Sequence, residues 1–345
     1  MRGARIGVLM GGTSAERDVS LRSGQAVATA LQAAGHDVAS VVLGAGSSVL
    51  EVLAKARLDV AFLALHGRLG EDGCVQGILE VLGIPYTGSG VLASALAMDK
   101  LKAKELFRLH NVPTPPYYEL TAAQARSGVE ETHGSFGYPA VVKPRREGSS
   151  IGVTLVEDRR QLVAAIETAL EYDDSVLVER FIRGREIAVG LLGERVLGAI
   201  EIAPKRPLYD FEAKYTPGMS DYFLPARVSA TRMRGVLNLA ERAAAALGTR
   251  GVCRVDLLVT EGMNEYVLEV NTLPGMTPTS LLPKIAAAAG FDFVSLCETM
   301  LRQALGADPS ALTESARVQD GSGVRPDSRV PSASQEPPDA LRAAV

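Results

Sequence analysis

The stretch from Val252 to Asn271 constrains the fold of this chain more than any other part of the sequence. It reads as two strands, Val252–Thr260 and Tyr266–Asn271, separated by turn-forming residues at positions 261–264. Strands joined by so short a turn pair with each other as an antiparallel hairpin. The sequence therefore predicts a β-hairpin at this position.

Polar side chains share one face of this hairpin. With the turn centred between positions 262 and 263, Asp256 lies opposite Glu269 and Arg254 lies opposite Asn271. Side chains alternate between the faces of a strand, so all four project from the same side. Facing carboxylates repel each other, and a divalent cation removes that penalty; an all-oxygen set of Asp, Glu and Asn suits Mg²⁺. The alternative is an exposed sheet face with carboxylates splayed into water. The turn-rich loop that follows and the helix opened by Ser280 favour a built site.

Composition and charge exclude several classes of protein. The net charge of −4 and the pI near 5.7 argue against a general affinity for nucleic acid or anionic membranes. No apolar run approaches the length of a membrane span, and Ile6–Met10 is too short for a signal peptide. The three cysteines, Cys74, Cys253 and Cys297, indicate a reducing cytoplasm and neither a disulfide framework nor a zinc site.

The N-terminal region alternates between strand and helix patterns. The expected elements are strands at Ile6–Met10, Asp37–Leu43 and Val60–Leu65, with helices at Ser20–Ala34 and Val49–Ala56 between them. Such an alternation is typical of a parallel sheet with crossover helices. Ligands of parallel sheets lie beyond the carboxyl ends of the strands.

Two loops at those strand ends carry candidate site residues. The first, Gly11–Ser20, lacks the G-x-G-x-x-G fingerprint, so a nicotinamide-binding enzyme is not supported. Its Glu16 is either a charge favoured by the helix N-terminus or a carboxylate aimed at a substrate amine. The second loop, His66–Gly73, opens with His66, which is either a structural histidine or a site residue.

A helix with exposed lysines is expected at Met98–His110, and the prolines that follow it mark a domain boundary. Its Lys100 is a surface charge unless the helix borders a phosphate site. Next comes the strand Tyr138–Pro144, whose Lys143 lies at the strand end. The glycine- and serine-rich loop 145–152, with Ser149 and Ser150, is either a hairpin turn or a polyphosphate cradle of backbone N–H groups and hydroxyls.

The next part of the chain is read as antiparallel strands, then a long loop, Lys205–Ala226, that has the character of a lid. Lys214 and Tyr215 place a cation and a phenol together on this loop. From Ala307 the sequence is rich in proline and free of aromatic residues, which predicts a disordered tail. The expected divisions are residues 1–112, 113–205, 206–306 and the tail 307–345.

Seven motifs in order resemble the D-alanine–D-alanine ligases of the ATP-grasp superfamily, over roughly residues 5–305. They are GGTSAERDVS, HGRLGEDG, VLASALAMDK, VVKPRREGSSIGV, YDFEAKY, RVDLLV and EVNTLPGMTPTSLLP. The resemblance implies a mixed α/β and α+β chain: an ATP-grasp fold with an N-terminal parallel-sheet α/β domain. It implies that ATP drives the joining of two D-alanines through an acyl phosphate, for peptidoglycan synthesis in the cytoplasm. It also implies a homodimer, with no nucleic-acid or membrane partner.

The same resemblance implies roles for individual residues. Asp256 and Glu269 would hold one Mg²⁺ ion, and Glu269 and Asn271 a second, with Mn²⁺ as a substitute. The residues implied for ATP are Lys100, Lys143, Ser150 and Lys214 at the phosphates, Glu179 and Ile182 at the adenine, and Glu186 at the ribose. The residues implied for the amino-acid substrates are Glu16 with Ser149 and Tyr215, the oxyanion donors Arg254 and Gly275, Ser280 and Leu281 at the second carboxylate, and His66 in an ancillary place.

Three other functions compete with this one. Ligases of the same family make D-alanyl-D-lactate or D-alanyl-D-serine, and the lactate-making relatives typically replace the Lys-Tyr segment of the lid with one that carries a histidine. Here Lys214 and Tyr215 are intact, which favours the dipeptide. A catalytically inactive regulator on this fold would be expected to lose Asp256, Glu269, Asn271 or Arg254, and none is lost.

Overall fold

The computed structural model describes residues 3–44, 46, 48–127, 137–205, 216, 218–262 and 264–306. The chain divides into two compact units, Met1–Pro309 and Ser310–Val345, and every described residue belongs to the first. The tail predicted to be disordered, 307–345, lies outside the described residues, as do Lys214 and Tyr215 of the predicted lid. None of the helices in the described ranges is long and apolar enough to cross a membrane.

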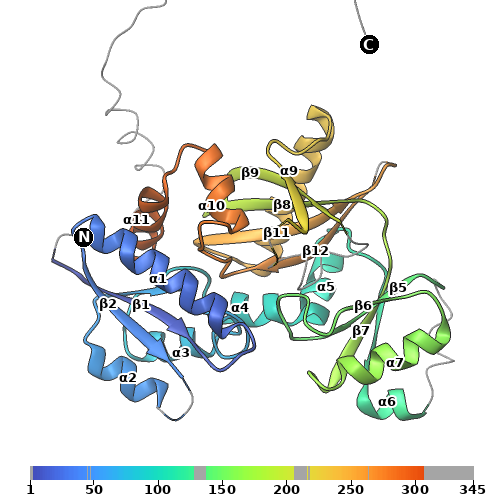
Figure 1. Cartoon of the computed structure of the whole chain (residues 1–345), viewed down its shortest axis with the longest axis horizontal. Coiled ribbons are helices and arrows are strands. Elements are labelled where there is room, and N and C mark those ends of the chain that lie inside the picture. Colours follow the sequence, from blue (N-terminus) through green and yellow to red (C-terminus); the bar gives the residue numbers. More distant parts are fainter. Residues whose placement is uncertain are drawn as a thin grey trace, which may run out of the picture. The chain divides into compact units, whose positions relative to one another are not determined.

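The first sheet is parallel, as the alternation of the sequence predicts. Its strands are β1 (Arg5–Gly11), β2 (Asp37–Leu43) and β3 (Val60–Leu63), in the order β2-β1-β3. The crossover helices are α1 (Arg17–Ala33) and α2 (Val49–Ala56) (Figure 1). The central strand β1 is apolar and buried over nearly its whole length, as expected for a strand covered on both faces.

Three helices follow, α3 (Cys74–Val81), α4 (Val91–Met98) and α5 (Lys100–Leu109). The single helix predicted to begin at Met98 was placed two residues too early. Asp99 has extended backbone angles, which end α4, and its carboxylate accepts a hydrogen bond from the Lys102 N–H as the cap of α5. The expectation that the lysines of this helix are exposed is also wrong in part, because Lys100 and Lys104 are buried.

The second sheet is antiparallel, with the order β4-β7-β5-β6. Its strands and covering helices are β4 (Tyr117–Thr121), α6 (Ala122–Ser127), β5 (Ala140–Pro144), β6 (Thr154–Val156), α7 (Arg159–Ala169) and β7 (Ser175–Arg180). Helix α7 buries Leu162, Ala165 and Ile166 against this sheet, and together they form a core cluster of their own. Strand β4 and helix α6 were not predicted from the sequence.

The third sheet is also antiparallel, with the order β10-β9-β8-β11-β12. Its strands are β8 (Arg185–Leu192), β9 (Arg195–Pro204), β10 (Ser220–Phe223), β11 (Val252–Val259) and β12 (Glu265–Asn271). Strand β10 lies inside the segment predicted to be a loop. Strands β8 and β9 precede the predicted boundary at residue 205 but pair within this sheet. The division into domains stays a prediction.

The third sheet is covered on both faces. Helix α9 (Ala230–Leu247) packs on one face against side chains such as Ile187 and Val255. On the other face, α10 (Leu281–Ala288) and α11 (Phe293–Ala304) form a core with β8, β9 and the first sheet, in which α1 and α11 lie side by side (Figure 1). The hairpin of β11 and β12 is therefore held rigidly.

Candidate active site

The register of the β11–β12 hairpin is the one predicted at its polar end. Arg254 pairs with Asn271, and Asp256 pairs with Glu269. Beyond Asp256 the register shifts, so that Val259 pairs with Glu265 and Leu268 is left without a partner in the ladder. This β-bulge was not predicted, because the alternation of the sequence fits one regular register from the turn onward.

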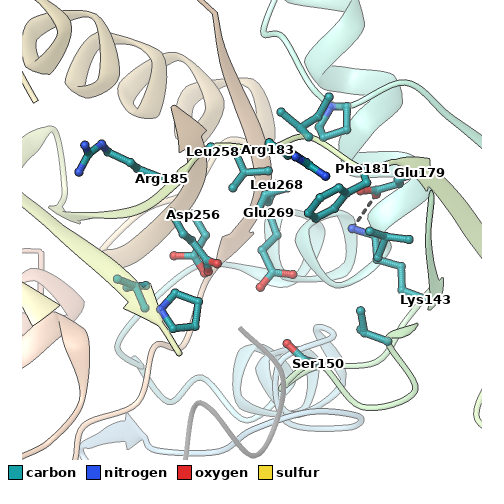
Figure 2. Close-up of a pocket in the computed structure, with 18 of the residues that line it drawn as sticks. Lys143, Ser150, Glu179, Phe181, Arg183, Arg185, Asp256, Leu258, Leu268 and Glu269 are labelled. Atoms are coloured by element: carbon teal, nitrogen blue, oxygen red, sulfur yellow. Dashed lines mark ion pairs between the residues drawn. The ribbon is translucent and has the colours of Figure 1, made fainter. Parts of the chain in front are cut away.

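The bulge changes which side chains face the site. Val267 is fully buried in the core beneath the sheet, whereas both Leu268 and Glu269 line a cavity of about 450 Å³. From β11, Asp256 and Leu258 line the same cavity. In Figure 2 the carboxylates of Asp256 and Glu269 point into the same open space, with Ser150 across from them. The cavity is of the size that holds a nucleotide-sized ligand.

The Asp256 carboxylate is bonded on both oxygens. Arg254 donates to it from Nε at 2.7 Å and from Nη2 at 2.8 Å, and Asn271 Nδ2 donates to it at 3.1 Å. Within the described ranges no group of three or more His, Cys, Asp or Glu side chains is placed to hold a metal ion. The predicted set would not form such a group, because it has two carboxylates, Asp256 and Glu269, and the amide of Asn271. Two facing carboxylates in one cavity, with the Asn271 amide bonded to Asp256 beside them, fit Mg²⁺ by their donor chemistry.

A buried cluster of three charges lies at the opposite wall of the cavity, which Glu179 and Lys143 of the cluster line. Glu179 on β7 lies 2.6 Å from Lys143 Nζ and 3.1 Å from Lys104 Nζ (Figure 2 marks the first pair). Burial would raise the pKa of Glu179, but the two lysines outweigh it and lower that pKa. Burial lowers the pKa of Lys104 to about 8. Lys104 was not singled out from the sequence; the signal was its position four residues after Lys100, on the same helix face.

The glycine- and serine-rich loop lies between this wall and the first sheet. Lys100, the first residue of α5, donates from Nζ to the Glu147 carbonyl. Ser149 and Ser150 have φ angles of +48° and +57°, a strained region for residues that carry a side chain. Such strain is commonly retained at ligand-binding loops. A Cβ atom on Gly148 would lie 2.5 Å from Glu16 Oε2, so the loop approaches Glu16 this closely only with glycine there.

Glu16 is buried beside this loop and is not a solvated helix charge. It immediately precedes α1, its side chain is buried, and it accepts a hydrogen bond from the Ser149 hydroxyl. The two residues are 133 positions apart in the chain, so the contact joins the first sheet to the loop of the second. The pair named from the sequence, Glu16 and Ser149, is brought together by the fold.

His66 lies in a buried polar network next to Glu16. Its Nδ1 is 3.8 Å from Glu71 Oε1, and its Nε2 is 3.5 Å from the Ser23 hydroxyl. Burial lowers the pKa of the imidazole, but the hydrogen bond and charge of Glu71, with the charge of Glu16, outweigh it, so the pKa is raised. Glu71 and Ser23 were not identified from the sequence.

The loop after the hairpin carries further residues of the predicted set, which do not line the cavity. Ser280 caps α10, and its hydroxyl accepts a hydrogen bond from the Thr277 N–H at 3.1 Å. A Cβ on Gly275 would meet the Ser280 Oγ at 2.9 Å, and Leu281 follows as the first residue of α10. The Met276 N–H donates to the Ser23 hydroxyl at 3.3 Å, which fixes this loop against α1.

Two more residues implied for ATP, Ile182 and Glu186, line the cavity at the edge between the second and third sheets. Four other residues of the predicted set also line the cavity: Lys100, Lys143, Ser150 and Glu179. Charged residues of both antiparallel sheets and of the loop thus meet around one space. Such an arrangement can hold a polyphosphate and bring its end to Glu269 and Asp256.

Known proteins resemble this chain over most of its length. The family model described as D-ala D-ala ligase C-terminus matches residues 106–302, and the model for the N-terminus matches residues 44–89. A D-alanine–D-alanine ligase of Geobacter sulfurreducens is 53% identical over 302 residues, which cover 87% of this chain and 94% of the relative. The chain belongs to the D-alanine–D-alanine ligase family. It is therefore an enzyme, a ligase, as its motifs predict.

Solved structures confirm the fold class of this ligase. A D-alanine–D-alanine ligase from Bacillus anthracis complexed with ATP has a TM-score of 0.77 and 34% identity, covering 91% of this chain and all of that one. The VanG D-Ala:D-Ser ligase of Enterococcus faecalis has a TM-score of 0.76 and 30% identity, covering 87% of this chain and 99% of that one. The predicted ATP-grasp fold with an N-terminal parallel sheet is confirmed.

Proposed function

We propose that this enzyme joins two D-alanines into D-alanyl-D-alanine at the expense of ATP, by way of an acyl phosphate. A carboxylate is a poor electrophile, so an oxygen of the first D-alanine attacks the γ-phosphorus and ADP leaves. The amine of the second D-alanine then attacks the carbonyl carbon, the C–O bond to phosphate breaks, and phosphate leaves. The observation that carries this proposal is the cavity itself, in which Asp256 faces Glu269.

In this proposal ATP occupies the cavity, with adenine near Glu179 and Ile182 and ribose at Glu186. Lys100, Lys143 and Ser150 bind the phosphates, so that negative charge is neutralised and the terminal phosphorus is held in line. The placement of all six around one cavity supports these roles. Lys214 would reach the γ-phosphate from the segment outside the described residues.

Asp256 with Glu269, and Glu269 with Asn271, would hold two Mg²⁺ ions, or Mn²⁺ in their place, which would supply positive charge at the transferring phosphoryl group. Arg254 donates to Asp256 in this structure. In the reaction it would donate to the developing oxyanion, together with the Gly275 N–H.

We propose separate subsites for the two D-alanines. Glu16 would receive the ammonium of the first D-alanine and, with Ser149 and Tyr215, would keep it in place. His66 lies beside Glu16 in an ancillary place. Ser280 and Leu281, at the start of α10, would bind the carboxylate of the second D-alanine, which a helix N-terminus favours.

The biological setting is part of the proposal. D-Alanyl-D-alanine would enter peptidoglycan, and the enzyme would act in the cytoplasm as a homodimer. A second function, D-alanyl-D-serine formation, is favoured by one observation, the likeness of the fold to a D-Ala:D-Ser ligase. The greater identity to D-alanine–D-alanine ligases favours the first.

One assay separates these functions: phosphate release from ATP and the product formed, with D-alanine alone or with D-serine, D-lactate or L-alanine added. We expect one phosphate per D-alanyl-D-alanine, and no stimulation by L-alanine. A chain that makes no dipeptide with D-alanine, or prefers D-serine or D-lactate as second substrate, would contradict the proposal.

A further inference from the structure

Arg145 makes a fork of hydrogen bonds that the reaction outlined above does not use. It is the first residue after β5, and its guanidinium donates to Asp99 from Nε at 2.7 Å and from Nη2 at 2.6 Å. Nη1 donates to Glu119 Oε1 at 2.9 Å. All three side chains are at most one-quarter exposed. Such a bidentate pair fixes both position and orientation.

The partner of this fork is the cap of α5. Asp99 accepts the Lys102 N–H at 3.1 Å, so it already fixes the first turn of the helix. The backbone of Arg145 holds the same turn, because the Lys100 N–H donates to the Arg145 carbonyl at 3.1 Å. Side chain and main chain of one residue thus fix two consecutive residues, Asp99 and Lys100.

Arg145 is itself anchored to the second sheet. Its N–H donates to the Ser175 carbonyl at 3.2 Å, at the start of β7. Lys143 precedes it by two residues on β5, and the loop with Ser149 and Ser150 follows it. Arg145 therefore joins the start of α5, with Lys100, to the strand that carries Lys143.

Lys100 needs such support on electrostatic grounds. It is the first residue of α5, whose first turn contains no acidic residue. The N-terminal end of a helix carries partial positive charge, which disfavours a cation there. A lysine side chain also has much rotational freedom to lose when it is held in one place. The carboxylate of Asp99, held by Arg145, compensates for the first effect.

We propose that Arg145 is a positioning residue for ATP: through Asp99 it holds Lys100 in register with Lys143 and the phosphate loop. This inference rests on the proposed role of Lys100 and Lys143 at the phosphates. Arg145 does not touch ATP in this scheme. Its loss changes where Lys100 lies and leaves every proposed ATP contact chemically intact.

The test compares two neighbouring arginines. Arg145→Met removes the fork, and Arg146→Met removes the exposed arginine beside it, which pairs with Asp173 and Asp174. Asp99→Asn keeps a good helix cap but loses the charge that holds Arg145. The dissociation constant of a non-hydrolysable ATP analogue and the KM values for ATP and D-alanine are measured for each, with thermal melting as a check on folding.

We expect Arg145→Met and Asp99→Asn each to raise the analogue dissociation constant and the KM for ATP about tenfold, with the KM for D-alanine unchanged. Arg146→Met should match the wild type. In a Lys100→Met background, Arg145→Met should have little further effect, since it acts through Lys100. Equal ATP affinity of Arg145→Met and Arg146→Met, or a full tenfold loss in the Lys100→Met background, would overturn the inference. A wild type that binds the analogue but makes no dipeptide would overturn the proposed function and leave this test intact.

Discussion

Asp256 and Glu269 face each other across two strands but have different surroundings. Asp256 is buried and bonded by Arg254 and Asn271, whereas Glu269 is half-buried at the bulge and lines the cavity. In the proposed mechanism Glu269 is also the one residue shared by both metal ions. The consequence of changing it is therefore the sharpest test of the metal assignment.

We expect Glu269→Gln to lower ligase turnover by at least about two orders of magnitude, because each metal ion would lose a carboxylate. Removing one charge from a facing pair of carboxylates does not damage packing, so the melting temperature should change little. The matched control is Glu265→Gln on the same strand, which loses an ion pair with Arg232 outside the cavity. Turnover of Glu269→Gln close to that of Glu265→Gln, at ordinary Mg²⁺, would refute the assignment.

A second residue with unusual electrostatics is Glu201, which is buried on β9 between two half-exposed arginines. It accepts hydrogen bonds from Arg227, through both the N–H and the guanidinium, and from Arg185. Burial raises the pKa of Glu201, but these bonds outweigh it and lower the pKa to about 2. A carboxyl whose pKa is lower in the folded chain stabilises it above the ordinary pKa near 4.5, and that contribution is lost as the pH falls toward 2.

Glu201→Gln should therefore lower the free energy of unfolding at pH 7 by about 1–3 kcal/mol, since water around the two arginines weakens the pairs. The difference from the wild type should shrink as the pH falls below 4.5, where the carboxyl of the unfolded wild-type chain becomes protonated, and it should vanish near pH 2, where the folded chain takes up the same proton. Urea unfolding at several pH values measures this. Glu194→Gln, in the exposed turn between β8 and β9, is the control. A difference that does not vary with pH would contradict the argument.

At the scale of elements, the loop between β5 and β6 depends on its close approach to Glu16. Gly148→Ala places a Cβ 2.5 Å from Glu16 Oε2, so the carboxylate has to move. We expect the KM for D-alanine to rise about tenfold, with little change in stability because a flexible side chain can yield. Steady-state kinetics and thermal melting measure the two effects.

The control for this variant is Gly235→Ala. Gly235 lies within α9 and has no heavy atom within 4 Å of a built Cβ. Alanine favours helix more than glycine, so this variant should be more stable by about 0.5–1 kcal/mol and equally active. A KM for D-alanine that is unchanged in Gly148→Ala would show that the loop tolerates displacement of Glu16.

The hairpin shows how far the sequence predicts these elements. The residues Arg254, Asp256, Glu269 and Asn271 identify the polar end by their period of two and their chemistry, and that register is confirmed. The bulge at Leu268 could not be seen, because one extra residue in a strand leaves no local signature. Strand β10 was missed for a related reason: four residues are too few to establish a period.

The burial of charged side chains is the other feature that could not be predicted from the sequence. A lysine on a helix, such as Lys104, is expected to be exposed to solvent. Its full burial is explained by its ion pair with Glu179, which lies 75 positions later in the chain. The same holds for Arg145, whose partners Asp99 and Glu119 come from two other elements. Contacts between residues this distant in sequence depend on how the sheets pack, which local patterns do not specify.

At the scale of the described molecule, the three sheets do not share one core. The first and third sheets bury side chains together, such as Phe62 of β3 with Ile285 of α10. The second sheet has a smaller cluster of its own with α7. Its contacts with the rest include polar ones, among them Lys104–Glu179 and Arg145–Asp99. The cavity is lined from both the second and the third sheet, so a bound nucleotide would couple them.

This arrangement predicts that the second sheet opens before the others. A small core joined to its surroundings by polar contacts should reach a partly unfolded state at lower free energy than the shared core. In native-state hydrogen exchange without ligand, the amides of β5 and β7 should therefore show a lower free energy of opening than those of β1 and β11. A non-hydrolysable ATP analogue at 100 times its dissociation constant should raise the values for β5 and β7 by up to about 2.7 kcal/mol, since the opened form has lost half of the cavity. Helix α2, which contributes no residue to the cavity, is the internal control. Equal opening free energies in all three sheets without ligand would mean that they unfold as one unit, and a uniform rise on adding the analogue would mean that the cavity does not couple the second sheet to the third.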